Sequence, residues 1–233
     1  MSDSPFNPER RAWLLQAGRF LAGGIIAGVS LPLFIRKAVA MAPRVYHAGI
    51  RSLEGEVRIN GELVKAGALV KMGDVVSTGS KSWAIFVMGT DAFLIRDNSR
   101  VEFKDVMDSS RGIVMTHIHI AGKLLSVFGK GERRLITPTA AAGVKGTGVY
   151  VEAEPDVTYL CVCYGVVELE SASNPDVRET IRTTHHESPR YIYGQGAAKT
   201  IEKAKMINHK DKELVMLEAL VGRRPPFDEN NEY

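Results

Sequence analysis

The two cysteines of this chain, Cys161 and Cys163, stand two residues apart in the segment 158–165. Their neighbours are tyrosine, leucine and valine, residue types that favour β-strands. Successive side chains of a strand point to opposite faces, so both thiols are predicted to lie on the same face. Two thiols side by side either fill a core or bind something.

A disulfide between these two cysteines fits a strand poorly. Residues i and i+2 of a strand are about 6.6 Å apart, from a rise of about 3.3 Å per residue. A disulfide instead brings the two Cβ atoms to about 3.8 Å. Such a bond would need a bulge or a strained strand, and it would be labile rather than structural.

A metal ion is the more permissive alternative, and His185 and His186 follow the cysteines by about twenty residues. Cys161, Cys163, His185 and His186 would form a Cys2His2 set suited to zinc or another transition metal. Adjacent strand residues face opposite ways, so both histidines can bind one ion only if they lie in a turn. Pro189 makes a turn plausible; otherwise one histidine binds and the other faces solvent. In the competing interpretation, the cysteines are small buried side chains and the histidines are surface residues.

The other histidines are weaker candidates. His117 and His119 form a second same-face pair, which we interpret as exposed strand residues. His209 falls in the first turn of a predicted helix and could reach a site beneath it, whereas His47 is expected to be exposed. A Cys163–His185 nucleophile pair is conceivable. However, the chain lacks the Gly-x-Ser-x-Gly, Cys-x-x-Cys and His-Glu-x-x-His motifs, and we predict no enzyme.

The elements that must position these residues are predicted to be strands. Short β-forming runs alternate with turn residues about every ten positions, which is typical of an all-β fold of many short antiparallel strands, in a sandwich, a barrel or a coil of strands. We assign residues 43–196 to this β domain and residues 197–233 to a C-terminal helical segment and tail. Helices are expected over 197–205 and 209–221, the second capped by Asn208.

The N-terminal residues 1–42 have the features of an export signal. Arg10 and Arg11 precede an apolar run, and Ala-x-Ala cleavage candidates end at Ala40 and Ala42. Paired arginines before a modestly apolar segment are typical of a twin-arginine signal. We therefore expect a periplasmic protein; an uncleaved signal would anchor it to the inner membrane through residues 13–35.

Charge argues against nucleic acid as a partner. The chain carries 30 basic and 27 acidic side chains, of which five and two fall in residues 1–42. The remaining body has 25 of each and is neutral, so it has no field to attract a polyanion.

Several motifs, in order, resemble the FecR-type sensor domain of the bacterial envelope. The most specific are Gly-Asp-x-x-x-Thr-Gly at 73–79 and Gly-Thr-Gly-Val-Tyr at 146–150. A subset of FecR-like proteins also resembles this chain in its Cys-x-Cys-Tyr-Gly strand and downstream His-His. The resemblance covers about residues 50–170. It implies an envelope sensor that signals to a sigma factor, although only about 19 residues precede the apolar run here, too few for the cytoplasmic domain of full transducers.

Two functions follow as hypotheses. The first is a non-catalytic envelope sensor or binding module whose partners are envelope proteins or a small ligand. The second is a metalloprotein that uses the Cys-x-Cys and His-His residues for metal sensing or metal-dependent folding.

Overall fold

The computed structural model describes residues 48–109 and 112–227. The expected export signal or anchor, His47 and the acidic tail from residue 228 lie outside these residues. Within them, no helix has the length and the apolar character needed to cross a membrane.

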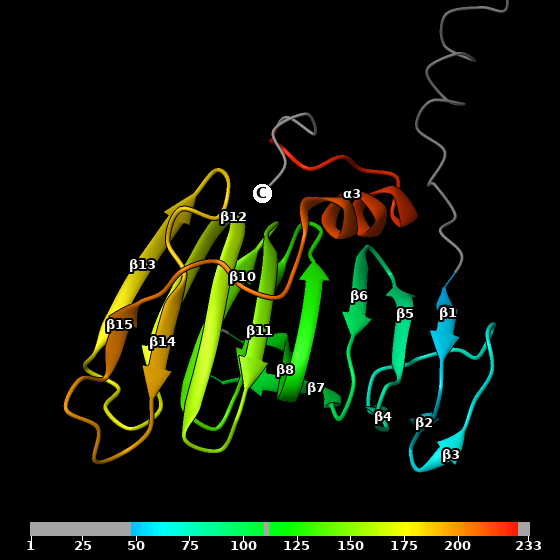
Figure 1. The fold of residues 1–233 in the computed structure, drawn as a ribbon, viewed down its shortest axis with the longest axis horizontal. Coiled ribbons are helices and arrows are strands. Elements are labelled where there is room, and N and C mark those ends of the chain that lie inside the picture. The colour runs from blue at the N-terminus through cyan, green and yellow to red at the C-terminus, as the bar shows by residue number, and fades with distance from the viewer. Residues whose placement is uncertain (1–47, 110–111, 228–233) are drawn as a thin grey trace, which may run out of the picture. The chain divides into compact units, whose positions relative to one another are not determined.

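The described chain is mostly β, as the sequence predicts, with a single helix, α3 (Asp211–Leu220). Figure 1 shows the strands in order along the chain. They are β1 (Gly49–Glu54), β2 (Val57–Ile59), β3 (Glu62–Leu63), β4 (Val75–Thr78), β5 (Trp83–Met88), β6 (Asp91–Ile95), β7 (Arg100–Asp108), β8 (Ile113–Val127), β9 (Glu132–Ile136), β10 (Ala140–Lys145), β11 (Gly148–Ala153), β12 (Val157–Ser171), β13 (Arg178–Thr183), β14 (Arg190–Tyr193) and β15 (Ile201–Lys203).

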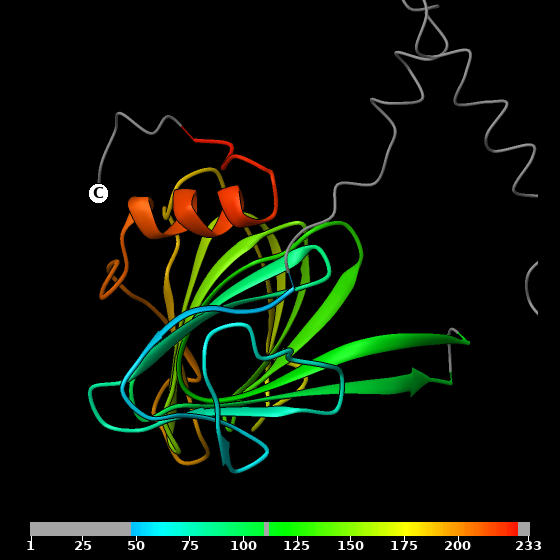
Figure 2. The same ribbon diagram turned by 90° about the vertical axis from the view of Figure 1, so that its right-hand side faces the viewer.

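The strands form two sheets, which we call sheet A and sheet B. Sheet A has the order β1-β5-β6-β8-β11-β12-β14-β15, and sheet B has the order β3-β2-β4-β7-β8-β9-β10-β12-β13. The long strands β8 and β12 belong to both sheets. All pairs are antiparallel except β8–β9, which is parallel and departs from the predicted pattern. In Figure 2 the paired ends of β7 and β8 extend beyond the other strands.

Glycines sit where the two long strands pass from one sheet to the other. Gly122 in β8 has φ +89° and Gly165 in β12 has φ +97°, a region that disfavours other residues. A Cβ at Gly122 would lie 2.4 Å from Ser99 Oγ, and one at Gly165 would lie 2.4 Å from Thr147 Cγ2. These close approaches let β8 and β12 turn the corner that joins the sheets.

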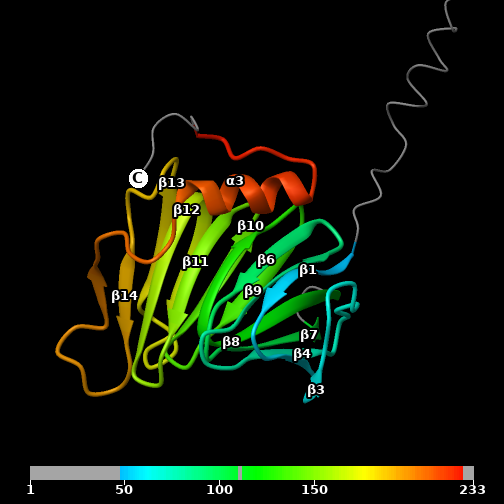
Figure 3. The ribbon, with the colours of Figure 1, turned by 45° about the vertical axis from the view of Figure 1, so that its right-hand side comes forward.

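Two apolar clusters follow from this arrangement. The inner core lies between the sheets and contains a group of touching aromatic rings, Phe86, Phe93, Phe103 and Phe128. The outer core lies on the other face of sheet A, under α3, which contacts β6 and β8. Figure 3 shows α3 running across the ends of the strands. The outer core consists of Ile85, Val87, Ala92, Leu94, Leu125, Val127, Tyr150, Tyr159, Cys161, Cys163, Tyr164, Leu214, Leu217 and Val221.

The C-terminal segment corrects two sequence predictions. The expected helix over 197–205 is wrong, because residues 201–203 form β15, which pairs with β14 and completes the edge of sheet A. The second helix forms but begins at Asp211 rather than His209. Asn208 does not cap it: its φ is +57° and its amide donates to Glu152. Instead, the Glu213 carboxylate accepts the Lys210 N–H at 2.9 Å.

Candidate metal centre

Strand β12 presents both cysteines to the outer core. Leu160 and Val162 point into the inner core, so alternation turns Cys161 and Cys163 to the opposite face. Both thiols are free and fully buried. The two cysteines therefore lie on the same face of β12, as strand alternation predicts.

His186 reaches this face from the bend that follows β13. Its backbone N–H donates to Cys163 O at 3.0 Å, and its φ is +59°, which turns the ring back over β12. Glu187 stabilises the bend by accepting the Thr184 and His185 N–H groups at 2.8 and 3.0 Å. Burial opposes ionisation of Glu187, but the hydrogen bonds from Thr184 and His185 outweigh it and hold its pKa at about 2.

His209 comes from the opposite side, on the segment that leads into α3. Its ring stacks on Tyr150 of β11, with the centroids 4.6 Å apart and the planes at 26°. The Tyr150 hydroxyl in turn donates to Glu152 at 2.7 Å. The aromatic stack fixes the plane of the imidazole against sheet A.

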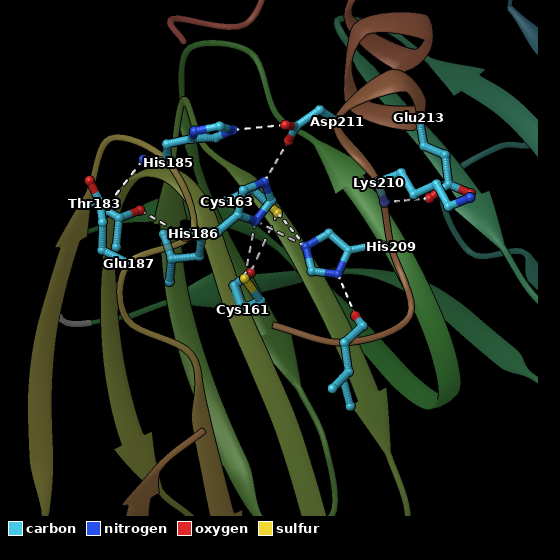
Figure 4. Close-up of polar contacts among 12 residues, drawn as sticks. Cys161, Cys163, Thr183, His185, His186, Glu187, His209, Lys210, Asp211 and Glu213 are labelled. Atoms are coloured by element: carbon cyan, nitrogen blue, oxygen red, sulfur yellow. Dashed lines mark hydrogen bonds and ion pairs between the residues drawn. The ribbon is translucent and has the colours of Figure 1, made fainter. Parts of the chain in front are cut away.

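The four side chains converge on one point (Figure 4). Cys161 Sγ lies 3.4 Å from His186 Nδ1, and Cys163 Sγ lies 3.5 Å from His209 Nε2. The two imidazole nitrogens are 3.1 Å apart. All four ligand atoms lie within 4.8 Å of one another, and all four residues are buried.

These separations match a tetrahedral ion. Bonds of about 2.3 Å to sulfur and about 2.0–2.1 Å to nitrogen place sulfur and nitrogen ligands about 3.5 Å apart, and two nitrogens about 3.3 Å apart. The observed sulfur–nitrogen and nitrogen–nitrogen distances lie close to both values.

In each imidazole, the nitrogen that points away from the sulfurs donates a hydrogen bond. His186 Nε2 donates to the Asp211 carboxylate at 2.9 Å, and His209 Nδ1 donates to the Ile207 carbonyl at 2.7 Å. In the neutral rings the inner nitrogens therefore carry lone pairs, and these face each other at 3.1 Å. A cation between them, either a metal ion or a shared proton, would stabilise this arrangement. Carboxylate and carbonyl partners of this kind orient metal-binding histidines.

Burial and mutual contact shift the pKa values of three of these side chains in different directions. Burial raises the pKa of the Cys163 thiol well above its ordinary value. A hydrogen bond from Cys163 is the largest influence on the pKa of the Cys161 thiol. Together with His186 and His209, it outweighs burial and lowers the pKa of Cys161 to about 4. Burial opposes the charged form of His186, but Cys161 and Asp211 raise its pKa overall.

The sequence prediction of the ligand set is only partly matched by this geometry. Cys161, Cys163 and His186 come together, whereas His185 is not among the four converging side chains. His185 Nε2 instead contacts Asp211 Oδ2 at 2.9 Å, and its ring stacks on Phe227 at 4.4 Å.

His209 takes the place that the sequence analysis gave to His185. Its predicted position in the first turn of the final helix was the available signal, but no local pattern connects it to the cysteines. His117 and His119 lie elsewhere, on the part of β8 that pairs with β7 in sheet B.

A catalytic interpretation can be tested against the same geometry. Cys161, His186 and Asp211 lie in the order of a nucleophile, a base and an orienting carboxylate. However, Cys161 and Cys163 are fully buried and His186 is 4% exposed, so a substrate cannot reach the sulfur. The second thiol and the second imidazole also surround the position that a substrate carbonyl would need. The arrangement favours a closed ligand set over an active site.

Comparisons with known proteins add a distant structural likeness. No protein-family model matches the chain, and no curated protein matches it. Two crystal structures of a candidate anti-sigma factor from Parabacteroides distasonis ATCC 8503, at 1.65 and 2.50 Å resolution, are similar with a TM-score of 0.47 and 13% identity. Each alignment covers 62% of this chain and 64% of the other, so the chain spans less than two thirds of those structures. The interpretation of the centre therefore rests on its own geometry.

Proposed function

We propose that this chain is a non-catalytic β module that binds one transition-metal ion through Cys161, Cys163, His186 and His209. One observation carries the proposal: two imidazole nitrogens, both left with lone pairs by their outer hydrogen bonds, lie 3.1 Å apart beside two sulfurs. A bound cation with two thiolates and two neutral imidazoles satisfies every one of these buried groups.

Zinc is the ion that fits best. A tetrahedral set of two sulfurs and two nitrogens suits Zn²⁺, which has no redox chemistry and no geometric preference of its own. Four protein ligands leave no open position for water or substrate, which is the pattern of structural sites. The role of the ion is then to fix structure or to report its own availability.

Metal analysis of the full chain, purified without a histidine tag, tests this proposal. We expect about one equivalent of zinc, since structural sites are normally occupied. Replacing zinc by Co²⁺ should give the intense visible bands of tetrahedral cobalt and a thiolate charge-transfer band. A Cys161→Ala/Cys163→Ala variant is the matched control and should bind neither ion. Less than about 0.2 equivalents, with no uptake of added zinc or cobalt, would overturn the proposal.

We further propose that the module is exported and acts as a FecR-like envelope sensor. The support is the ordered set of FecR-like motifs together with the paired arginines, Arg10 and Arg11. Within the fold, two of these motifs pack on each other. Thr147 fills the space beside Gly165, and Gly148 leaves room for the Tyr164 ring. Changing Arg10 and Arg11 to lysine should leave precursor in the cytoplasm, and unaffected export would remove the twin-arginine route.

A further inference from the structure

The last described part of the chain, residues 204–227, forms a strap over the outer core. It comprises a connecting segment, α3 and the turn that follows it. The Tyr159 hydroxyl pins the connecting segment to sheet A by donating to Lys205 O at 3.1 Å and accepting from Ile207 N at 3.2 Å. We call residues 204–227 the strap and the rest of the described chain the body.

The metal centre joins the strap to the body. Cys161, Cys163 and His186 belong to the body, and His209 belongs to the strap. The oxygens of Asp211, also in the strap, accept from His185 and His186 of the body. A bound ion thus closes the ligand set across the boundary, and Asp211 adds a second link beside it.

The body does not need the strap to bury its own interior. Among the described residues, the inner core contains none from the strap. The strap buries four apolar side chains, Leu214, Leu217, Val221 and Pro225. Others pack half-buried against the outer core, namely Ala204, Ile207, Met216, Leu220 and Phe227. A ten-residue helix does not persist alone in water, so α3 depends on what holds it to sheet A.

The two ends of the strap are held differently. At its far end, Glu218 accepts from the Tyr164 hydroxyl and from Arg223, and Arg223 also donates to Thr90 O. At its near end, Asn208 donates to Glu152 at 2.7 Å, and Arg96 donates to the Asn208 carbonyl and to Glu213 at 2.9 Å. These contacts and those of Tyr159 flank His209 and Asp211, the two residues that join this end of the strap to the candidate centre. Loss of the ion should therefore act first on the near end.

We propose that the bound ion is a clasp that holds the near end of the strap, residues 204–213, on sheet A, so that metal occupancy controls whether the outer core is covered there. This inference rests on the proposed metal centre. Without the ion, His209 loses its link to the body and the facing imidazoles no longer share a cation. Tyr150 and Tyr159 lie under this end of the strap and would gain exposure.

Hydrogen–deuterium exchange of the full chain, measured with zinc bound and after chelation, tests the clasp. We expect amides in 204–213 to exchange at least tenfold faster without the ion. Amides in 217–223 should change less, and those of β9 and β10 in sheet B should stay the same. His209→Ala should reproduce this pattern in the presence of zinc. Leu217→Ala, which leaves all four ligands in place, should loosen α3 while keeping one equivalent of zinc.

The outcomes separate the clasp from the metal centre. One equivalent of zinc with unchanged exchange in 204–213 after its removal would overturn the clasp and leave the metal centre intact. Equal loss of protection in sheet B and the strap would also overturn it, because the ion would then stabilise the whole domain. Failure to bind any metal would overturn both proposals.

Discussion

The inner and outer cores are built on the two faces of sheet A, yet they differ in the polar groups buried beside them. In β12, Leu160 and Val162 enter the inner core while Cys161 and Cys163 enter the outer core. The inner core is built mainly from apolar side chains, and their burial is the main source of its stability. The outer core lies beside His186, His209, Asp211 and Glu218, which are all buried. Buried polar groups cost free energy unless each is paired, and the proposed ion would add to the pairing of the polar groups beside the outer core.

The largest effect on the free energy of unfolding should come from a cavity in the inner core. Phe93 is 1% exposed and contacts the rings of Phe86, Phe103 and Phe128. Phe93→Ala should lower the free energy of unfolding by about 3–5 kcal/mol. Urea unfolding with and without zinc should give the same loss. A loss of stability that depends on zinc would mean that the two cores are energetically coupled.

Removing the ion should have the next largest effect and should act through the outer core. With free zinc at about 100–1,000 times its dissociation constant, chelation should lower the free energy of unfolding by about 2.7–4.1 kcal/mol. Thermal melting of the wild type and of Cys161→Ala/Cys163→Ala checks this. The variant should melt identically with and without chelator. Superimposable wild-type curves would contradict the prediction.

The corner at Gly165, two residues beyond Cys163 in β12, offers a smaller test that does not involve the proposed ligands. Gly165→Ala places a Cβ 2.4 Å from Thr147 Cγ2 at φ +97° and should cost about 1–3 kcal/mol. Thr147→Ser removes that methyl group, so the double variant should recover part of the loss in a double-mutant cycle. Strictly additive losses would show that the close contact is not the cause.

The roles of the histidines and of Asp211 can be separated by metal affinity. His185→Ala should keep one equivalent of zinc, whereas His209→Ala should bind it far more weakly. Asp211→Asn should weaken binding by about 10–100-fold, because the carboxylate orients His186. Competition with a chromogenic chelator measures all three variants. Loss of zinc from His185→Ala but not from His209→Ala would restore the ligand set predicted from sequence.

The smallest effect is expected at the edge of the outer core. Arg96 lies 5.6 Å from the centre of the Tyr150 ring and pairs with Glu213, and its side chain is one quarter exposed. Arg96→Gln should cost about 0.5–1 kcal/mol, since both interactions are partly solvated. Chemical denaturation at low and at high salt checks the value. A loss above that range would give Arg96 a larger part in holding the strap.

The sequence by itself determined the features that depend on neighbouring residues. Alternation in β12 places Cys161 and Cys163 on one face, because the period of a strand is two. The recurring turn residues predict an all-β chain, and the apolar stripe of Leu214, Leu217, Leu220 and Val221 predicts the final helix. Strand alternation did not apply to His185 and His186, because both lie in a bend and both imidazoles contact Asp211 at 2.9 Å.

Only the tertiary structure decided which histidines meet the sulfurs. Cys163 and His209 are 46 residues apart, and nothing local relates them; the strap crossing sheet A brings them together. The segment 201–203 became β15 because an open sheet edge beside β14 supplied its hydrogen-bond partners. Closing the long loop between Cys163 and His209 costs conformational entropy, which contacts elsewhere in the fold must offset, so this pairing depends on the whole fold rather than on local pattern.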